Sequence, residues 1–377
     1  MILNYIDFNI SNEIHLLCYC FVVCMENLII EGAKWLQEDK HNNPKGTIKK
    51  RTFYVLSCFK DYLKNNKVEV ESSTGKSINE IIAIVSNAQT IFSTILDYYL
   101  KGLHFIAVQT FKTYIADLAI NHEAIGIRLY KARKPESYYP FTNDEMFHIP
   151  YDKRKKVGNQ RFSISGLPCL YLGSSTYVCW EEMERNDFTY CNFCGFTNNK
   201  IMDVYDLSLP LMISNLEDIK RICIILACSL SAKREELFKV EYVLPQCLLQ
   251  ALLLRHHFYH RDKKLFGIKY ISSHALNGDA DCFKIDFGDN NWVKRFINYV
   301  FPASSAEESG FNSELKALFK QTATTTLFNE NLLTPNKIVS GNSHDRYLDS
   351  QFGLMDAYLD EKMGFNPLRK EIRIITD

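Results

Sequence analysis

Residues 160–182, QRFSISGLPCLYLGSSTYVCWEE, bring a cation and two carboxylates into one short stretch. Arg161 lies near its start, and Gly166 and Pro168 mark a turn. The apolar run 169–172 then predicts a short buried strand. An arginine and a carboxylate separated by a turn and a strand can meet over one cleft, where they would hold an anionic group and stabilise a positive charge.

A short helix is expected directly after this strand. Ser175 is the predicted N-cap of a helix that begins at Thr176 and carries Glu181 and Glu182 after about two turns. In an average protein, an arginine near a helical glutamate is a structural ion pair, so this arrangement alone does not define an active site.

Length and composition predict an ordinary globular protein of about two domains. The chain has 377 residues, of which 46% are hydrophobic and 23% charged. The 44 basic residues balance the 44 acidic ones, so no global field favours nucleic acid or an anionic membrane. Twelve cysteines without a small disulfide-rich framework favour reduced thiols and a cytoplasmic protein.

Neither a metal site nor a membrane anchor is expected. Cys191 and Cys194 form one CxxC pair, but two further zinc ligands are missing at a recognisable spacing. The apolar run 14–24 is shorter than the roughly 18 residues that span a bilayer. Met25 is an alternative start of the folded part, which would make the first 24 residues an extension.

The first 122 residues are expected to form a helical bundle with a regulatory or partner-binding role. Ser77 and Glu80 form a capping-box pattern, and apolar residues follow at helical spacing over 81–99. A polar connection is expected over 65–76 and a second apolar helix over 103–118. The texture changes after Gly126 to short apolar runs, which places a domain boundary near residue 122.

The remaining residues, 123–377, are expected to form a mixed α/β domain with a C-terminal helical extension, which makes the whole chain α+β. Strands are expected over 127–132, 201–207, 238–243, 267–271 and 282–287, with helices over 216–230 and 245–255. The basic run 153–156 is interpreted as a solvated face.

Five pieces of this second part, in order over residues 127–300, resemble the RES domain. That family comprises bacterial toxins that consume NAD and is named for an arginine, a glutamate and a serine. The pieces are Arg161-Phe162-Ser163 before Gly166 and Pro168, Leu170-Tyr171-Leu172 with Ser174 and Ser175, the pair Glu181-Glu182, residues 240–246 (VEYVLPQ), and residues 267–272 (GIKYIS). The resemblance implies a fold like that of ADP-ribosyltransferases, in a long form with a helical N-terminal domain.

The resemblance also implies roles for particular residues. Glu182 matches the family's glutamate, Ser272 its serine, and Tyr171 the aromatic residue beside the nicotinamide. One position departs from the family, which often has an arginine where this chain has Lys131. Lysine keeps the charge but loses the bidentate fork that suits a phosphate, and Arg133 is the residue that would compensate.

Cleavage of NAD suits these residue types. Nicotinamide leaves as a neutral molecule, so no acid is needed, and positive charge gathers on the ribose. Glu182 about 4 Å from that charge would contribute roughly 4 kcal/mol at an effective dielectric near 20, or about a thousandfold in rate. Arg161 would hold the pyrophosphate, the ring of Tyr171 would face the pyridinium, and Ser272 would bond the carboxamide or ribose.

The predicted function is therefore that of an NAD-degrading toxin or defence effector, acting by glycohydrolysis or phosphorolysis and arresting growth, with NAD as a substrate and no cofactor. Two alternatives stay open: an ADP-ribosyltransferase that modifies a protein or nucleic acid, and a catalytically weakened binding module. A toxin–antitoxin or phage-defence setting, an antitoxin or regulator bound by the helical domain, and a homodimer are expectations about partners.

Overall fold

The computed structural model describes residues 28, 31–41, 46–135, 139–210, 213–233, 235–259, 265–273, 292–325, 347 and 350–365. These residues form two compact units. One unit holds the described residues up to Gln89 together with Leu209–Ser231. The other holds Thr90–Ser208 and the described residues from Ala232 onward. The predicted α+β class is confirmed, because the first unit is helical and the second contains a mixed sheet with helices.

The division between the two compact units falls within helix α4 (Ile78–Leu100). The domain boundary near residue 122 stays a prediction; the first strand of the sheet, β1, covers Asn121–Glu123. The proposed N-terminal extension, the apolar run 14–24, Met25 and the strand expected over 282–287 all lie outside the described residues.

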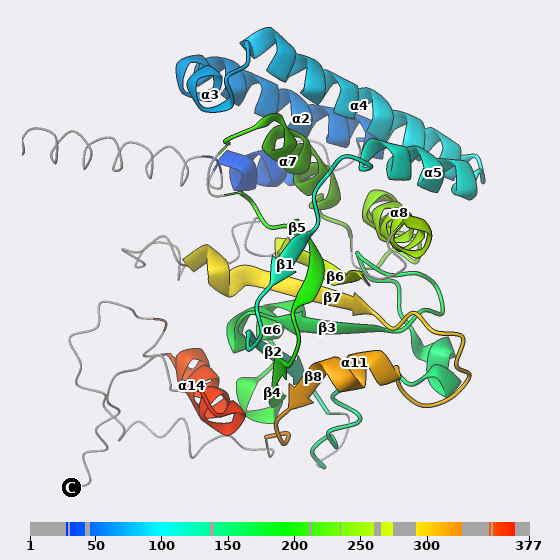
Figure 1. Ribbon diagram of the computed structural model, residues 1–377, viewed down its shortest axis with the longest axis vertical. Coiled ribbons are helices and arrows are strands. Elements are labelled where there is room, and N and C mark those ends of the chain that lie inside the picture. The colour runs from blue at the N-terminus through cyan, green and yellow to red at the C-terminus, as the bar shows by residue number, and fades with distance from the viewer. Residues whose placement is uncertain are drawn as a thin grey trace, which may run out of the picture. The chain divides into compact units, whose positions relative to one another are not determined.

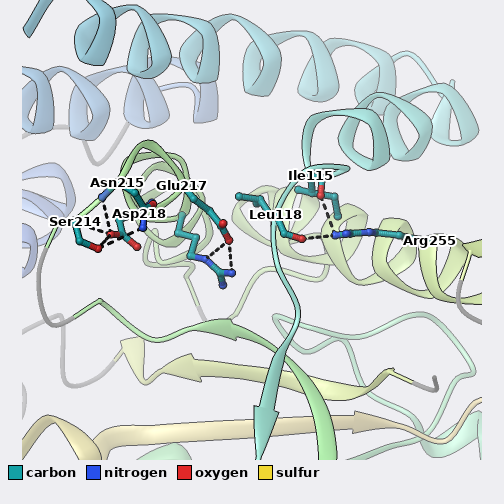
Figure 2. Close-up of polar contacts among 8 residues, drawn as sticks. Ile115, Leu118, Ser214, Asn215, Glu217, Asp218 and Arg255 are labelled. Carbon is teal, nitrogen blue, oxygen red and sulfur yellow. Dashed lines mark hydrogen bonds and ion pairs between the residues drawn. The ribbon is translucent and has the colours of Figure 1, made fainter. Parts of the chain in front are cut away.

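The helical unit contains α2 (Ile48–Asn65), α3 (Lys67–Thr74), the first part of α4, and α7 (Leu216–Cys228). Helix α7 packs against α2 and begins with a capping box between Asn215 and Asp218, which Figure 2 shows beside Ser214. The predicted capping box at the start of α4 is present, since the backbone amide of Ser77 donates to Glu80 Oε2 over 3.0 Å.

The polar connection expected over 65–76 is wrong, because most of these residues form α3 (Lys67–Thr74). Gly75 ends this helix in the left-handed conformation (φ 65°), which glycine adopts at little cost. The Glu71 carboxylate accepts a hydrogen bond from the amide of Ile78 over 2.6 Å and so joins the end of α3 to the start of α4.

Helix α4 has a buried apolar stripe, as its sequence predicts. Ile81, Val85, Phe92 and Leu96 are fully buried on it. Within the described part of the chain, α4 is also the one helix long and apolar enough to cross a membrane. Core helices of soluble proteins share that composition, so the finding is weak evidence for a membrane span.

The second unit is built on an eight-stranded sheet in the order β1-β5-β6-β7-β3-β2-β4-β8 (Figure 1). Strands β5 and β6 are parallel, and the other neighbouring pairs are antiparallel. The strands other than β1 are β2 (Arg128–Arg133), β3 (Cys169–Gly173), β4 (Asn192–Asn198), β5 (Met202–Leu207), β6 (Leu265–Ile271), β7 (Ile297–Pro302) and β8 (Phe319–Gln321). The strands expected near 127–132, 169–172, 201–207 and 267–271 are thereby confirmed.

The same unit also contains α-helices and short 3-10 helices. They are the second part of α4, α5 (His104–Tyr114), α6 (Thr176–Glu182), α8 (Val243–Tyr259), α11 (Ser313–Leu318) and α14 (Gln351–Met363), with short 3-10 helices η1 (Tyr151–Lys156), η2 (Phe188–Tyr190), η3 (Val240–Tyr242) and η4 (Trp292–Phe296). Helices α5 and α8 pack together, and Arg255 of α8 donates to the carbonyls of Ile115 and Leu118 after α5, as Figure 2 shows.

The strand expected over 238–243 is wrong. The amide of Tyr242 donates to the carbonyl of Lys239, which closes a 3-10 turn, and α8 begins at Val243. A run of six residues does not distinguish a strand from the start of a helix by periodicity. Pro245 falls in the first helical turn, where its missing amide hydrogen costs nothing.

Candidate active site

A cavity of about 1170 Å³ lies in the sheet-containing unit. It brings together five of the six residues that the sequence singles out: Lys131, Arg133, Arg161, Tyr171 and Glu182. The sixth, Ser272, is fully buried and is not among the residues that line the cavity. Its hydroxyl donates a hydrogen bond to Glu182, which does line it. Side chains from distant parts of the sequence therefore converge on one hollow, which has the size of a small-molecule site.

Glu182 is the last residue of α6, and its side chain is exposed to the cavity. The predicted N-cap is present: the hydroxyl of Ser175 accepts a hydrogen bond from the amide of Val178 over 3.1 Å. Gly173 allows the close approach of this helix to β3, because a Cβ atom there would lie 2.5 Å from Val178 and 2.7 Å from the Cys179 sulfur. The N-cap at Ser175 and the close contact at Gly173 therefore fix the start of α6. Glu182, at the other end of this short helix, is positioned with it.

Glu181 has a different environment from its neighbour. It is buried, it accepts a hydrogen bond from the hydroxyl of Tyr177, and it pairs with Arg185 over 2.9 Å. These contacts account for the Glu181 carboxylate as a structural group. Of the two neighbouring carboxylates, Glu182 is therefore the one exposed to the cavity, and its role stays a prediction.

Two donors hold one oxygen of Glu182. Ser272 Oγ donates to Oε1 over 2.9 Å, and Asn298 Nδ2 donates to the same oxygen over 2.7 Å. Asn298 lies on β7 and also lines the cavity, but it is not among the residues that the sequence points to. Its signal is a lone amide in the apolar strand INYVFP, where packing alone would favour a hydrophobic side chain.

Aromatic rings line the cavity beside this carboxylate. Tyr171 is half-buried on β3, and its hydroxyl donates to the carbonyl of Phe162 over 2.7 Å. The ring of Phe162 lies 4.7 Å from that of Tyr270, which also lines the cavity. Burial, and after it the charge of Glu182, raise the pKa of the Tyr270 hydroxyl well above its usual range. Tyr270 is therefore a neutral hydrogen-bond donor at physiological pH.

Arg161 lies on the cavity wall with its guanidinium 5.1 Å from the centre of the Tyr242 ring. Tyr242 belongs to η3, the segment that the sequence wrongly suggests to be a strand. Lys239 lies 5.3 Å from the same ring. The 3-10 helix η3 thus places the ring of Tyr242 near two cations, an arrangement that favours cation–π interactions.

Lys131 and Arg133 form a second cationic region on β2. Lys131 Nζ donates to the carbonyl of Phe147 over 2.7 Å, and burial lowers the pKa of Lys131 to about 8. The Arg133 guanidinium lies 4.0 Å from the centre of the Phe141 ring and donates to the carbonyl of Glu145. Both side chains are anchored to the loop between β2 and β3, so this loop shapes the cavity.

His148 in the same loop is held as a neutral ring. Its Nε2 accepts the backbone amide of Asn312 over 2.9 Å, which leaves Nδ1 to donate to the carbonyl of Ile149 over 2.8 Å. Burial lowers the pKa of His148 to about 4. The ring therefore ties the cavity wall to the segment before α11 and carries no charge near neutral pH.

Metal ligands do not gather in the part of the chain that the structure describes: no group of three or more histidine, cysteine or acidic side chains is arranged to hold an ion. Cys191 and Cys194 are buried free thiols. Burial raises the pKa of the Cys194 thiol to about 12. Both cysteines pack as small apolar groups at neutral pH.

Comparison with known proteins gives one informative similarity. The chain is 30% identical over 275 residues to a protein of Bacillus subtilis (strain 168) described as "Putative toxin YopC". The similar region covers 64% of this chain and 58% of that protein, so the match spans little more than half of the relative. No family model matches the chain. No solved structure matches it.

Proposed function

We propose that this protein is a toxin of the RES kind that cleaves the bond between nicotinamide and ribose in NAD. The observation that carries the proposal is the Glu182 carboxylate, held by Ser272 at 2.9 Å and exposed in a cavity that also presents Arg161 and Tyr171. The similarity to a protein described as "Putative toxin YopC" supports the same direction at a coarser level.

The charges and rings of the cavity suit the parts of NAD. The pyridinium is cationic and would stack on an aromatic face such as that of Tyr171. The pyrophosphate is anionic and would pair with Arg161 or with Lys131. Glu182 would stabilise the positive charge that develops on the ribose as the bond breaks.

The acceptor of the ribosyl group distinguishes three related reactions. Water gives ADP-ribose, inorganic phosphate gives its phosphorylated form, and a protein or nucleic-acid acceptor gives a covalent adduct. Glu182 could orient any of these nucleophiles, so we propose NAD consumption as the shared activity and leave the acceptor to the products. Growth arrest by NAD depletion would follow from either of the first two.

The test is to incubate the purified protein with NAD, with and without phosphate, and to identify the products by mass. Release of nicotinamide is expected from the wild-type protein and its loss from Glu182→Gln. Glu181→Gln is the matched control, because it makes the same change one residue away in a carboxylate that Tyr177 and Arg185 enclose. It should lower stability but leave turnover per folded molecule within a few-fold of wild type.

Intact NAD after incubation with folded wild-type protein would overturn the proposal. Label from NAD retained on protein or nucleic acid would instead support ADP-ribosyl transfer. An inactive wild-type protein that gains activity on Lys131→Arg would support the weakened binding module. In cells, expression of the wild type and not of Glu182→Gln should lower NAD.

We also propose an antitoxin or regulator that binds the helical unit, a homodimer and a cytoplasmic location. These three proposals follow from the expected function. Co-purification of the native protein from its own host, followed by mass spectrometry, would test the first two.

A further inference from the structure

Asn298 is a polar side chain at the second position of β7, a strand of otherwise mostly apolar residues. Five of the six residues of β7 are buried, and Asn298 retains only 5% of its exposure. A buried amide without partners costs free energy, so its presence calls for hydrogen bonds that offset desolvation. Its Nδ2 atom lies 2.7 Å from Glu182 Oε1, which is a short charge-assisted bond.

The hydrogen bonds to the Glu182 carboxylate are one-sided. Among the residues that the structure describes, Ser272 and Asn298 both donate to Oε1, and no donor reaches Oε2. Two donors, one directly after β6 and one on β7, fix the rotation of the carboxylate about its last bond. The oxygen that they leave is the one available to a substrate in the cavity.

We propose that Asn298 is a positioning residue for the reaction, which acts through Glu182 by clamping Oε1 so that Oε2 points at the reacting ribose. The inference rests on the proposed function and names a residue beyond the arginine, glutamate and serine of that proposal. An amide suits this task because it donates without a charge of its own at any pH.

The register of the sheet explains how Asn298 comes to this position. Asn298 is opposite Gly173 of β3 on one side and opposite Tyr270 of β6 on the other. Gly173 has no side chain, so α6 can pack closely on this part of the sheet and bring Glu182 over β7. Ser174 adds a second link, since its hydroxyl accepts the amide of Ile297 over 3.0 Å.

Replacement of Asn298 by aspartate gives the sharpest test. The shape is kept, but a carboxylate now faces the Glu182 carboxylate at hydrogen-bond distance, and two such groups cannot both ionise freely. As pH falls, the pair takes up one proton, and one carboxyl can then donate to the other. That bond replaces the one that the wild-type amide makes at any pH. In Asn298→Asp the relative activity should therefore recover as pH falls.

The experiment measures NAD turnover by wild type, Asn298→Leu and Asn298→Asp between pH 5 and 8. Asn298→Leu should lose about 10- to 100-fold in kcat, with KM within about threefold, as expected for a lost bond to a charged group. The ratio of Asn298→Asp to wild-type kcat should rise as pH falls. Asn198→Leu and Asn198→Asp are the matched controls, because Asn198 is also buried, on β4. Among the described residues, its side chain bonds only the Ile127 amide and the carbonyls of Ala124 and Lys200.

The result that would overturn the inference is a folded Asn298→Leu with wild-type kcat, or an Asn298→Asp to wild-type ratio that does not depend on pH. A wild-type protein that leaves NAD intact would defeat the proposed function instead. In that case the clamp is tested without substrate, by following the side-chain carboxyl ¹³C signal of Glu182, assigned with Glu182→Gln. At pH 7, Asn298→Leu should shift this signal, because it removes one of the two hydrogen bonds to Oε1, and an unshifted signal would overturn the clamp. The same spectrum reports whether a variant is folded.

Discussion

A hydrogen bond links helix α14 to helix α6, which carries Glu182. The acceptor of this bond, the side chain of Asp356, is titratable. The Asp356 carboxylate of α14 accepts the amide of Thr176, the first residue of α6, over 2.9 Å. It also accepts the hydroxyl of Tyr347 over 2.6 Å. Burial raises the pKa of Asp356 from its ordinary value to about 6. We predict that Asp356→Asn changes the pH dependence of stability in a direction that this pKa fixes.

The sign and magnitude follow from proton binding. Between about pH 4 and 6 the folded protein keeps a proton on Asp356 that the unfolded chain has released, so the contribution of this group to the free energy of unfolding falls as pH rises. The gap between 3.8 and about 6 corresponds to about 3 kcal/mol. Asparagine does not titrate. The free energy of unfolding of Asp356→Asn, relative to wild type, should therefore be about 2 kcal/mol more favourable at pH 7 than at pH 4, where the unfolded aspartate is still partly protonated.

Urea unfolding at pH 4, 5, 6 and 7 measures this difference. Trp180 of α6 is a local probe, because its ring lies 5.1 Å from that of Phe352 on α14. Replacement of Trp35 and Trp292 by phenylalanine in both proteins leaves its fluorescence as the signal. Asp61→Asn, at an exposed aspartate of α2, is the control. A difference between Asp356→Asn and wild type that stays constant from pH 4 to 7 would refute the reasoning.

Three further predictions concern the same unit. Ser272→Ala removes the 2.9 Å bond to Glu182 and should lower kcat/KM for NAD by about 10- to 100-fold; an unchanged value in a product assay would contradict the role of Ser272. His148→Gln should gain up to about 3 kcal/mol over wild type as pH falls from about 6.5 to 4, because only the unfolded wild type takes up a proton there; urea unfolding at both pH values checks this, and a pH-independent difference would contradict it. Gly173→Ala should cost about 1–3 kcal/mol by overpacking against α6, whereas Gly158→Ala, where a Cβ meets nothing closer than 3.8 Å, should leave the thermal midpoint nearly unchanged; equal midpoints would contradict the tight contact.

Local patterns predicted the elements around the site well. The cap at Ser175 and the capping box of Ser77 with Glu80 depend on bonds within four residues, so their signals are complete in the sequence. The buried strand β3 is similarly visible as a short apolar run between turn residues. The preference for Glu182 over Glu181 came from a family pattern and stays a prediction; the structure shows that Tyr177 and Arg185 enclose Glu181.

Predictions from the sequence fail for segments whose conformation depends on residues elsewhere in the chain. The run over 238–243 has too few residues to show a period, and the helix that follows it decides its 3-10 turn. The polar segment that forms α3 shows no apolar stripe, and it is joined to α4 by the carboxylate of Glu71. Helix α7, although it lies between two strands of the sheet in sequence, belongs to the helical unit.

By itself the sequence determined the α+β class, the start of α6, and the residue types from which a charged cleft can be built. Only the tertiary structure decided which of these side chains share a cavity, because the sheet order brings β3, β6 and β7 together. Strands β3 and β7 are more than a hundred residues apart along the chain. It also added Asn298, whose local signal, an amide in an apolar run, does not identify its partner. A hydrogen bond between residues 116 positions apart leaves almost no trace in either local sequence, since its geometry exists only after the strands have paired.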